Sequence, residues 1–267
     1  MTASFHTQQS LLHDLRALGV QPGDGLFVHS SMRAIGRTVG GARSVVEALI
    51  TAVGEDGLVG MPGFSDDAYP PPWIDPKVHS PEDIRQIEAA VPGFDIETSP
   101  TAQMGVIAET FRTWPGTQRS SHPNVSVCLY GKAAGAFLEP HGMAWATGQH
   151  TPLGRLRTFP AMKMLLIGVG WNRCSALHTA EDLAPHKRTK VRRFKDGGRD
   201  GTWREEPDVA DDLNRLFPSV GAAFENTGAV SLGTFGDAST KLCDYATLLD
   251  FASAWIDRAN QESGDQH

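Results

Sequence analysis

The chain has 267 residues, of which 40% are hydrophobic and 21% are charged, and its formal net charge is −7. These values are ordinary for a soluble globular protein; the negative charge argues weakly against nucleic acid, which needs a basic face, and mildly favours a polycationic small-molecule partner. No stretch approaches the roughly 18 apolar residues of a membrane span, and neither a secretory signal nor a CxxC pair is present. We therefore expect a cytoplasmic protein that binds neither nucleic acid nor membrane.

Segments with helical spacing of apolar residues alternate with short apolar runs along most of the chain. Helices are predicted over residues 7–18, 40–57, 104–114, 132–141, 175–184, 211–225 and 246–259. Buried strands are predicted over residues 25–31, 58–64, 125–131 and 163–170, and an exposed β-hairpin over residues 188–206. This pattern predicts a layered α/β fold in a single domain over residues 1–267, with a central sheet flanked by helices and made mixed by the late hairpin.

Residues 65–100 interrupt this alternation. The segment is rich in proline, aspartate and aromatic residues, and it contains one helix for which Ser80 is the expected N-cap and Pro81 the first residue. A loop of this length in a compact domain is usually functional or mobile. We interpret it as a flap over one edge of the sheet.

Two loops carry polar groups that could bind a ligand. The stretch VHSSMRAIG, residues 28–36, places hydroxyls, backbone N–H groups and Arg33 at the end of a strand, where open α/β sheets tend to bind ligands. A polar turn that caps the next helix explains the same residues equally well. In RSSHP, residues 119–123, Arg119 could clamp a phosphate or carboxylate, although ordinary loop chemistry is the simpler interpretation.

The stretch CSALHTAEDLAP, residues 174–185, is the third candidate. On a helix, Glu181 and Asp182 follow His178 by three and four residues and share its side of the helix. A neighbouring carboxylate stabilises a protonated imidazole and fixes its tautomer, which suits a general base. The same spacing fits a surface histidine with salt-bridging neighbours, and spacing alone slightly favours that interpretation.

Other candidates are weaker. The histidines form no HExxH motif, so we expect no metal site. Cys174 lacks the flanking signature of a nucleophile. The basic residues between Lys187 and Arg193 are most simply the solvated face of the predicted hairpin.

Several of these pieces occur together and in a recognisable order. They are LFVHSSMRAIG, GLVGMPGFSDD, FDIETSPTAQMGVIAETFR, QRSSHPNVSVCLYGKAA, TPLGRL, LLIGVGWNRCSALHTAED and GDASTKLCDYATLLDFASAWI. With them the chain resembles the aminoglycoside N3-acetyltransferase family, the antibiotic acetyltransferases, which are structurally unrelated to the GNAT acetyltransferases. The resemblance spans roughly residues 8 to 257. It implies a mixed sheet flanked by helices and a cleft for acetyl-coenzyme A.

The resemblance also implies roles for individual residues. His178 corresponds to the catalytic histidine of the family, and Glu181 belongs to the same motif. The implied coenzyme A contacts are His29, Ser30, Ser31, Met32, Arg33, Ile35, Gly36, Arg119 and Ser120. The implied contacts to a polycationic amine are Asp66, Asp67, Tyr69, Asp182, Asp211 and Asp212. One departure is visible, because Cys174, Ser175 and Ala176 stand where relatives often have Asn-Thr-Thr or Asn-Thr-Ser.

The chemistry that this family performs defines what His178 would do. An ammonium group cannot attack a thioester, so a base must remove a proton as the amine is positioned. His178, oriented by Glu181, would remove it directly or through water, and Ser175 or a backbone N–H could stabilise the oxyanion. No acyl-enzyme is needed.

Three functions remain open on the sequence alone. The first is acetylation of the 3-amino group of aminoglycoside antibiotics, which would confer resistance. The second is acetylation of another primary amine, such as a biosynthetic intermediate. Several acids facing the cleft would favour aminoglycosides, and a small or basic pocket would favour the other amine. The third is a catalytically silent binding protein that keeps the fold. Either a monomer or a homodimer is compatible with the sequence.

Overall fold

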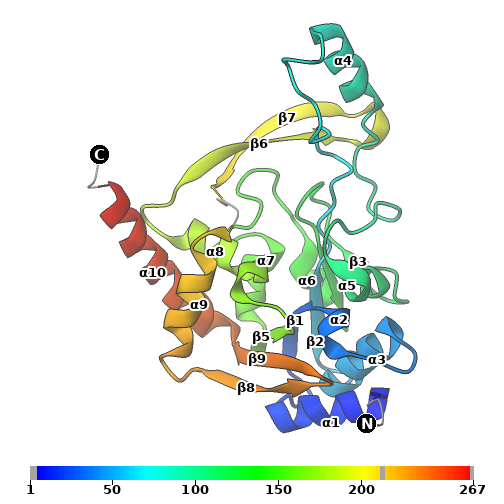
Figure 1. Ribbon diagram of the computed structural model, residues 1–267, viewed down its shortest axis with the longest axis vertical. Coiled ribbons are helices and arrows are strands. Elements are labelled where there is room, and N and C mark those ends of the chain that lie inside the picture. The colour runs from blue at the N-terminus through cyan, green and yellow to red at the C-terminus, as the bar shows by residue number, and fades with distance from the viewer. Residues whose placement is uncertain (1–4, 211–213, 265–267) are drawn as a thin grey trace.

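The computed structural model describes residues 5–210 and 214–264. Its centre is a seven-stranded sheet in the order β3-β4-β2-β1-β5-β9-β8 (Figure 1). The strands are β1 (Gly25–Ser30), β2 (Leu58–Pro62), β3 (Gln118–Arg119), β4 (Val127–Tyr130), β5 (Met162–Ile167), β8 (Val230–Phe235) and β9 (Ala238–Asp244). β1 runs parallel to β2 and β5, whereas β4 and β9 are antiparallel to their neighbours. The predicted layered α/β fold with a mixed sheet is confirmed.

Helices cover both faces of this sheet. One face carries α1 (Gln8–Leu18), α3 (Ala42–Val53) and α5 (Gly105–Arg112), with the short α2 (Met32–Ile35) at its edge. The other carries α6 (Ala134–Leu138), α7 (Pro152–Arg155), α8 (Ala176–Leu183), α9 (Phe217–Glu225) and α10 (Tyr245–Gly264). β1 is buried on both sides because Phe27 points into one core while Leu26 and Val28 point into the other. No described helix has the length and apolar character needed to cross a membrane.

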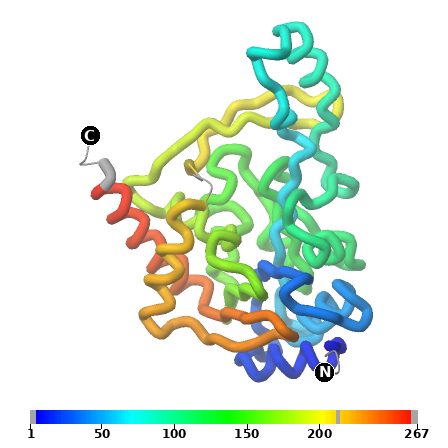
Figure 2. Tube along the Cα trace, viewed as in Figure 1, coloured from blue at the N-terminus to red at the C-terminus, as the bar shows by residue number. Residues whose placement is uncertain are grey.

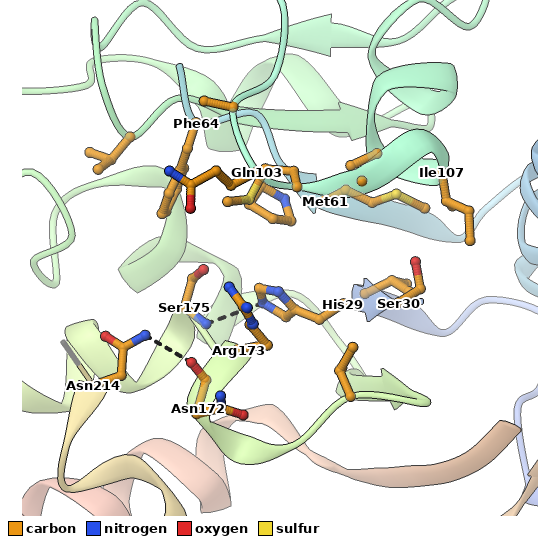
Figure 3. Close-up of a pocket in the computed structure, with 18 of the residues that line it drawn as sticks. His29, Ser30, Met61, Phe64, Gln103, Ile107, Asn172, Arg173, Ser175 and Asn214 are labelled. Atoms are coloured by element: carbon orange, nitrogen blue, oxygen red, sulfur yellow. Dashed lines mark hydrogen bonds between the residues drawn. The ribbon is translucent and has the colours of Figure 1, made fainter. Parts of the chain in front are cut away.

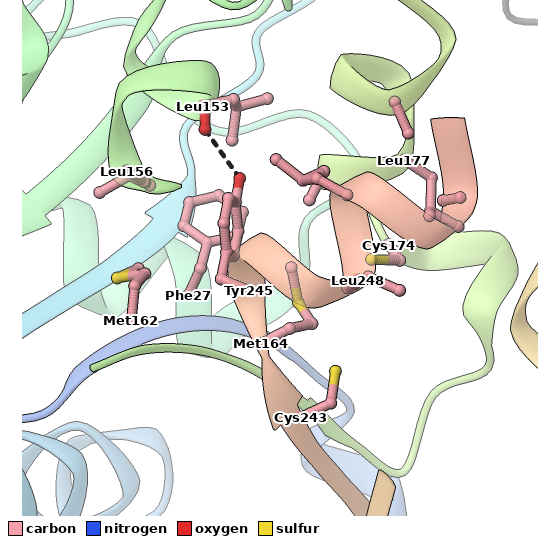
Figure 4. Packing of buried hydrophobic residues seen from close by; sticks show 14 of the residues in the cluster. Phe27, Leu153, Leu156, Met162, Met164, Cys174, Leu177, Cys243, Tyr245 and Leu248 are labelled. Carbon is pink, nitrogen blue, oxygen red and sulfur yellow. Dashed lines mark hydrogen bonds between the residues drawn. The ribbon is translucent and has the colours of Figure 1, made fainter. Parts of the chain in front are cut away.

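The core beneath α8 and α10 is fixed by one polar contact as well as by packing. Tyr245 is fully buried, and its hydroxyl donates a hydrogen bond to the Leu153 carbonyl at 2.9 Å (Figure 4). Its ring meets Phe27 edge to face, with the ring centroids 6.3 Å apart. Cys174 lies in the same cluster with no exposed surface. The loop before α8 is therefore anchored directly to the core.

The flap and the hairpin form one unit at the end of the molecule opposite the N-terminus (Figures 1 and 2). The flap contains α4 (Pro81–Ala90), and the hairpin consists of β6 (Thr189–Asp196) and β7 (Thr202–Val209). Lys195 donates its backbone N–H to the Ala68 carbonyl at 2.8 Å, and Arg193 pairs with Glu88 at 2.6 Å. Gly93 packs so closely on Gly198 that a Cβ atom would collide with the backbone there.

Three predictions about elements need correction. The late hairpin is a separate two-stranded sheet and does not make the central sheet mixed; β4 and β9 do that by pairing antiparallel to β2 and β5. A second hairpin, β8–β9, was not predicted, because β8 is mostly exposed and lacks an apolar run. Within the described part of the predicted helix over 211–225, α9 begins only at Phe217, followed by Pro218, which suits the first turn of a helix.

Candidate active site

A cavity of about 770 Å³ opens where the carboxyl ends of β1, β2 and β5 meet. This is the sheet edge where α/β proteins bind ligands, and the volume suits a drug-sized molecule. Its walls come from the loop after β1, the start of α5, the turn before β4, the β5–α8 loop and the hairpin. Figure 3 shows part of this lining, including His29, Gln103 and Arg173. Elements far apart in sequence therefore meet around one space.

His178 lies in the first turn of α8 and lines the cavity. Its Nδ1 is 2.7 Å from Oε2 of Glu181, and the two side chains are only 13% and 12% exposed. The ring also packs against Phe217, with centroids 4.8 Å apart. Because the carboxylate can only accept this hydrogen bond, Nδ1 carries a proton, and Nε2 of the neutral ring can accept one. The geometry is that of a half-buried, oriented imidazole.

His29, near the end of β1, and Ser175, directly before α8, contact each other on the cavity wall. The Ser175 backbone N–H donates to Nε2 of His29 at 3.2 Å. Burial, with smaller contributions from His178 and Arg173, lowers the pKa of His29 to about 3, so its ring is neutral and keeps its proton on Nδ1. Since its backbone N–H is used, Ser175 has its hydroxyl left to offer to a ligand.

The residues predicted to contact coenzyme A divide into three groups. Four of them line the cavity: His29, Ser30, Ser31 and Met32. Three in the same loop do not: Arg33 is exposed, Ile35 is fully buried in the core, and Gly36 ends α2. The Ser31 hydroxyl caps α2 by accepting the Ala34 N–H at 3.3 Å.

Arg119 and Ser120 form the third group and lie away from the cavity lining. Arg119 donates to the Ser126 hydroxyl at 2.9 Å, to the Ser99 carbonyl at 2.6 Å and to the Gly63 carbonyl. Ser120 is fully buried and accepts the Val127 N–H at 2.8 Å. Arg119 holds the ends of the flap against the sheet, and Ser120 is bound to β4. The part of both residues in coenzyme A binding stays a prediction to which this geometry adds no support.

The acids predicted to hold an amine are also divided. Asp66 is exposed and lines the cavity, as does Tyr69, whose hydroxyl accepts a hydrogen bond from Arg192. Asp67 is outside the lining and accepts the Ser99 hydroxyl at 2.7 Å. Asp182 pairs with Lys187 at 2.9 Å, away from the cavity. The remaining two, Asp211 and Asp212, fall outside the described residues.

Sequence reasoning missed several cavity residues. Arg173 stands two residues before Ser175, and its place three residues after the end of a predicted strand is a signal that it borders the site. Arg192 was assigned to a solvated face, which is wrong: its side chain is 10% exposed, pairs with the buried Asp208 at 2.5 Å and reaches the cavity. Alternation along the hairpin cannot reveal this, because the flap that covers Arg192 is about a hundred residues away.

Two further residues bear on whether a ligand fits here. Asn124 and Thr147 line the cavity, each 2% exposed, and the amide of Asn124 and the hydroxyl of Thr147 have no hydrogen-bond partner among the described residues. A buried polar group without a partner is costly, so a ligand with amide or hydroxyl groups gains hydrogen bonds there. The pantetheine amides of acetyl-coenzyme A and the hydroxyls of a sugar both have the required chemistry. No cluster of three or more potential metal ligands occurs within residues 5–210 and 214–264.

Comparison with known proteins identifies this arrangement. The family model described as aminoglycoside 3-N-acetyltransferase matches residues 27–257. The chain belongs to this family. It is 34% identical, over 94% of its length and 92% of the relative, to the SPbeta prophage-derived aminoglycoside N(3')-acetyltransferase-like protein YokD of Bacillus subtilis (strain 168).

Solved structures of family members have the same fold. AAC-IIIb, in a binary complex with CoASH, superimposes with a TM-score of 0.84 at 30% identity, covering 96% of this chain and 98% of that one. AAC-VIa bound to sisomicin gives a TM-score of 0.81 at 30% identity, covering 96% and 99%. The resemblance drawn from sequence motifs is therefore confirmed at the level of both family and fold.

Proposed function

We propose that this chain transfers the acetyl group of acetyl-coenzyme A to the 3-amino group of aminoglycosides, with His178 as the general base. The observation that carries the proposal is the 2.7 Å contact between Glu181 and His178, whose side chain lines the cavity. Family membership supports the reaction type, and the CoASH complex of AAC-IIIb supports the donor. The sisomicin complex of AAC-VIa supports an amino-sugar acceptor.

The reaction follows from the orientation of the imidazole. The acceptor amine attacks the carbonyl carbon of the thioester, and one N–H proton passes to Nε2 of His178. Glu181 stabilises the resulting imidazolium through Nδ1. The tetrahedral intermediate collapses when its C–S bond breaks, and Nε2 returns the proton to the departing sulfur. The net products are the N-acetylated amine and the free thiol of coenzyme A.

Ser175 is placed to assist this step. It directly precedes α8, is 8% exposed and lines the cavity with His178. With its backbone N–H bound to His29, the hydroxyl is the donor it can direct at the developing oxyanion. His29, held neutral by burial, acts as a positioning residue for this loop.

A second acceptor class is favoured by one observation. Among the described residues that line the cavity, Asp66 is the only carboxylate, while Arg173 and Arg192 contribute two guanidinium groups. Such a wall suits a primary amine with few positive charges, such as a biosynthetic intermediate, better than a strongly cationic antibiotic.

One experiment separates these possibilities. Thiol release from acetyl-coenzyme A is measured with a panel of aminoglycosides and with small primary amines, for wild type and His178→Ala, and the acetylated position is located by NMR. Turnover on aminoglycosides at the 3-amino group, lost in the variant, is the expected result. Turnover only on small amines selects the second acceptor class, and undiminished turnover in His178→Ala removes this residue as the base. No turnover on any amine supports a binding protein.

A further inference from the structure

The loop between β5 and α8 holds Arg173 in a fixed place on the cavity wall. It includes a 3-10 turn, Trp171–Arg173, in which Trp171 is buried and donates its indole N–H to Glu225 at 2.5 Å. The carbonyl of Asn172 accepts the Asn214 amide at 2.8 Å. With its preceding residues held in this way, Arg173 lies beside His29 and Ser175 (Figure 3).

No described residue neutralises the charge of Arg173, in contrast to that of Arg192. Arg192 is engaged with Asp208 and with the Tyr69 hydroxyl. Within the described part of the chain, Arg173 has neither an ion pair nor a hydrogen bond to its guanidinium, although it is exposed to the cavity. Asp66, the single carboxylate among the described lining residues, belongs to the flap. Among the described residues of the cavity wall, Arg173 is therefore the arginine whose charge has no partner.

Arg173 also acts close to the reacting groups. Its charge and that of His178 both contribute to the low pKa of His29, so the three side chains share one electrostatic environment. Arg173 precedes His178 by five residues, and His178 lies in the first turn of α8. The phosphates of coenzyme A are separated from its sulfur by the long pantetheine arm. With His178 and Ser175 meeting the thioester as proposed, Arg173 would therefore lie nearer to the acceptor than to the phosphates.

Resting on the proposed acetyl transfer, we propose that Arg173 sets the charge selectivity of the acceptor site, favouring amino sugars with few ammonium groups over polycationic ones. Each additional ammonium near the reacting amine meets the like charge of Arg173 in the cavity, which raises the dissociation constant. With only Asp66 to offset it among the described lining residues, the penalty grows with the number of amines on the acceptor.

The test measures acceptor binding directly, so it does not depend on turnover. Calorimetric dissociation constants are determined, with coenzyme A present, for an amino sugar with a single amine, the diamine 2-deoxystreptamine and the tetraamine neamine. Arg173→Gln is expected to tighten neamine binding about tenfold relative to the monoamine, and Arg173→Lys to keep the wild-type ranking. Arg199→Gln, which removes an exposed arginine of the hairpin turn outside the cavity, is the charge-matched control and is expected to leave the ranking unchanged.

Two results would overturn the inference. They are an unchanged acceptor ranking in Arg173→Gln, whether or not its affinity for coenzyme A falls, and an equal shift of the ranking in Arg199→Gln. Thiol release is recorded on the same samples. If the affinities of the acceptors shift as expected but no thiol is released, the role of Arg173 is supported and the proposed acetyl transfer is refuted. If thiol is released but the order of affinities is unchanged in Arg173→Gln, acetyl transfer is supported and the role of Arg173 is refuted.

Discussion

Replacing Glu181 by glutamine tests the proposed base through its partner. The substitution keeps the shape of the side chain but removes the negative charge that lies 2.7 Å from Nδ1 of His178. With side-chain exposures of 13% and 12%, solvent screens the pair little. A hydrogen bond to a charged partner contributes about 1.5–3 kcal/mol, and this stabilisation is largest when the imidazole holds the proton. Since 1.36 kcal/mol corresponds to a tenfold change in rate, kcat should fall roughly 10- to 150-fold.

The assay is steady-state thiol release at saturating acetyl-coenzyme A, with an acceptor that the wild type turns over. KM for the acceptor should change little, because Glu181 does not line the main cavity. Asp250→Asn serves as a control: it removes the same charge from an exposed carboxylate of α10 that pairs with Arg157, and should retain wild-type kcat. Thermal unfolding confirms that both variants fold. A kcat for Glu181→Gln within twofold of wild type would refute the orienting role of Glu181.

Three further predictions follow from named contacts. Ser175→Ala should lower kcat about 100-fold with little change in KM, measured by the same assay, if its hydroxyl is an oxyanion donor; a loss in KM alone would contradict this. Arg192→Met should lower the free energy of unfolding, measured in urea titrations, by about 3–5 kcal/mol, because it leaves Asp208, 1% exposed, as a buried unpaired charge. The double variant Arg192→Met with Asp208→Leu should recover most of that loss. Burial lowers the pKa of His29 from 6.5 to about 3 and that of His141 from 6.5 to about 4, so the unfolded chain binds more protons than the folded chain over these pH ranges. The free energy of unfolding should therefore be full above pH 6.5 and fall with decreasing pH, by up to about 1.4 kcal/mol per pH unit for each histidine. Urea titrations in which acidification left the free energy of unfolding unchanged would contradict this.

The sequence was informative where function depends on local spacing. His178 and Glu181 are three residues apart on one helix, so their contact follows from helical geometry as soon as the helix is recognised. The layered fold was likewise predictable, because buried strands and amphipathic helices leave distinct periodicities. Spacing alone still left a surface histidine slightly favoured, and only the accompanying motifs pointed to catalysis.

The roles of three arginines depend on contacts between distant segments, which the sequence does not reveal. Arg119 has the chemistry of a phosphate clamp, but its donors are used by carbonyls of residues 63 and 99, which no local pattern reveals. Arg192 sits in a basic run that resembles a solvated face, yet the flap buries it. Arg173 has no periodicity to mark it, and its importance appears only when the other residues around the cavity are known.

The close approach of Gly93 to Gly198 has a consequence for how this protein can diversify. The flap and the hairpin touch backbone to backbone at that point, with no room for a side chain on Gly93. A recombination event that imported either segment from a relative without the other would bring together two surfaces shaped for different partners. Residues 65–100 and residues 189–209 are therefore expected to be exchangeable only together, because their contact surfaces must match at Gly93 and Gly198.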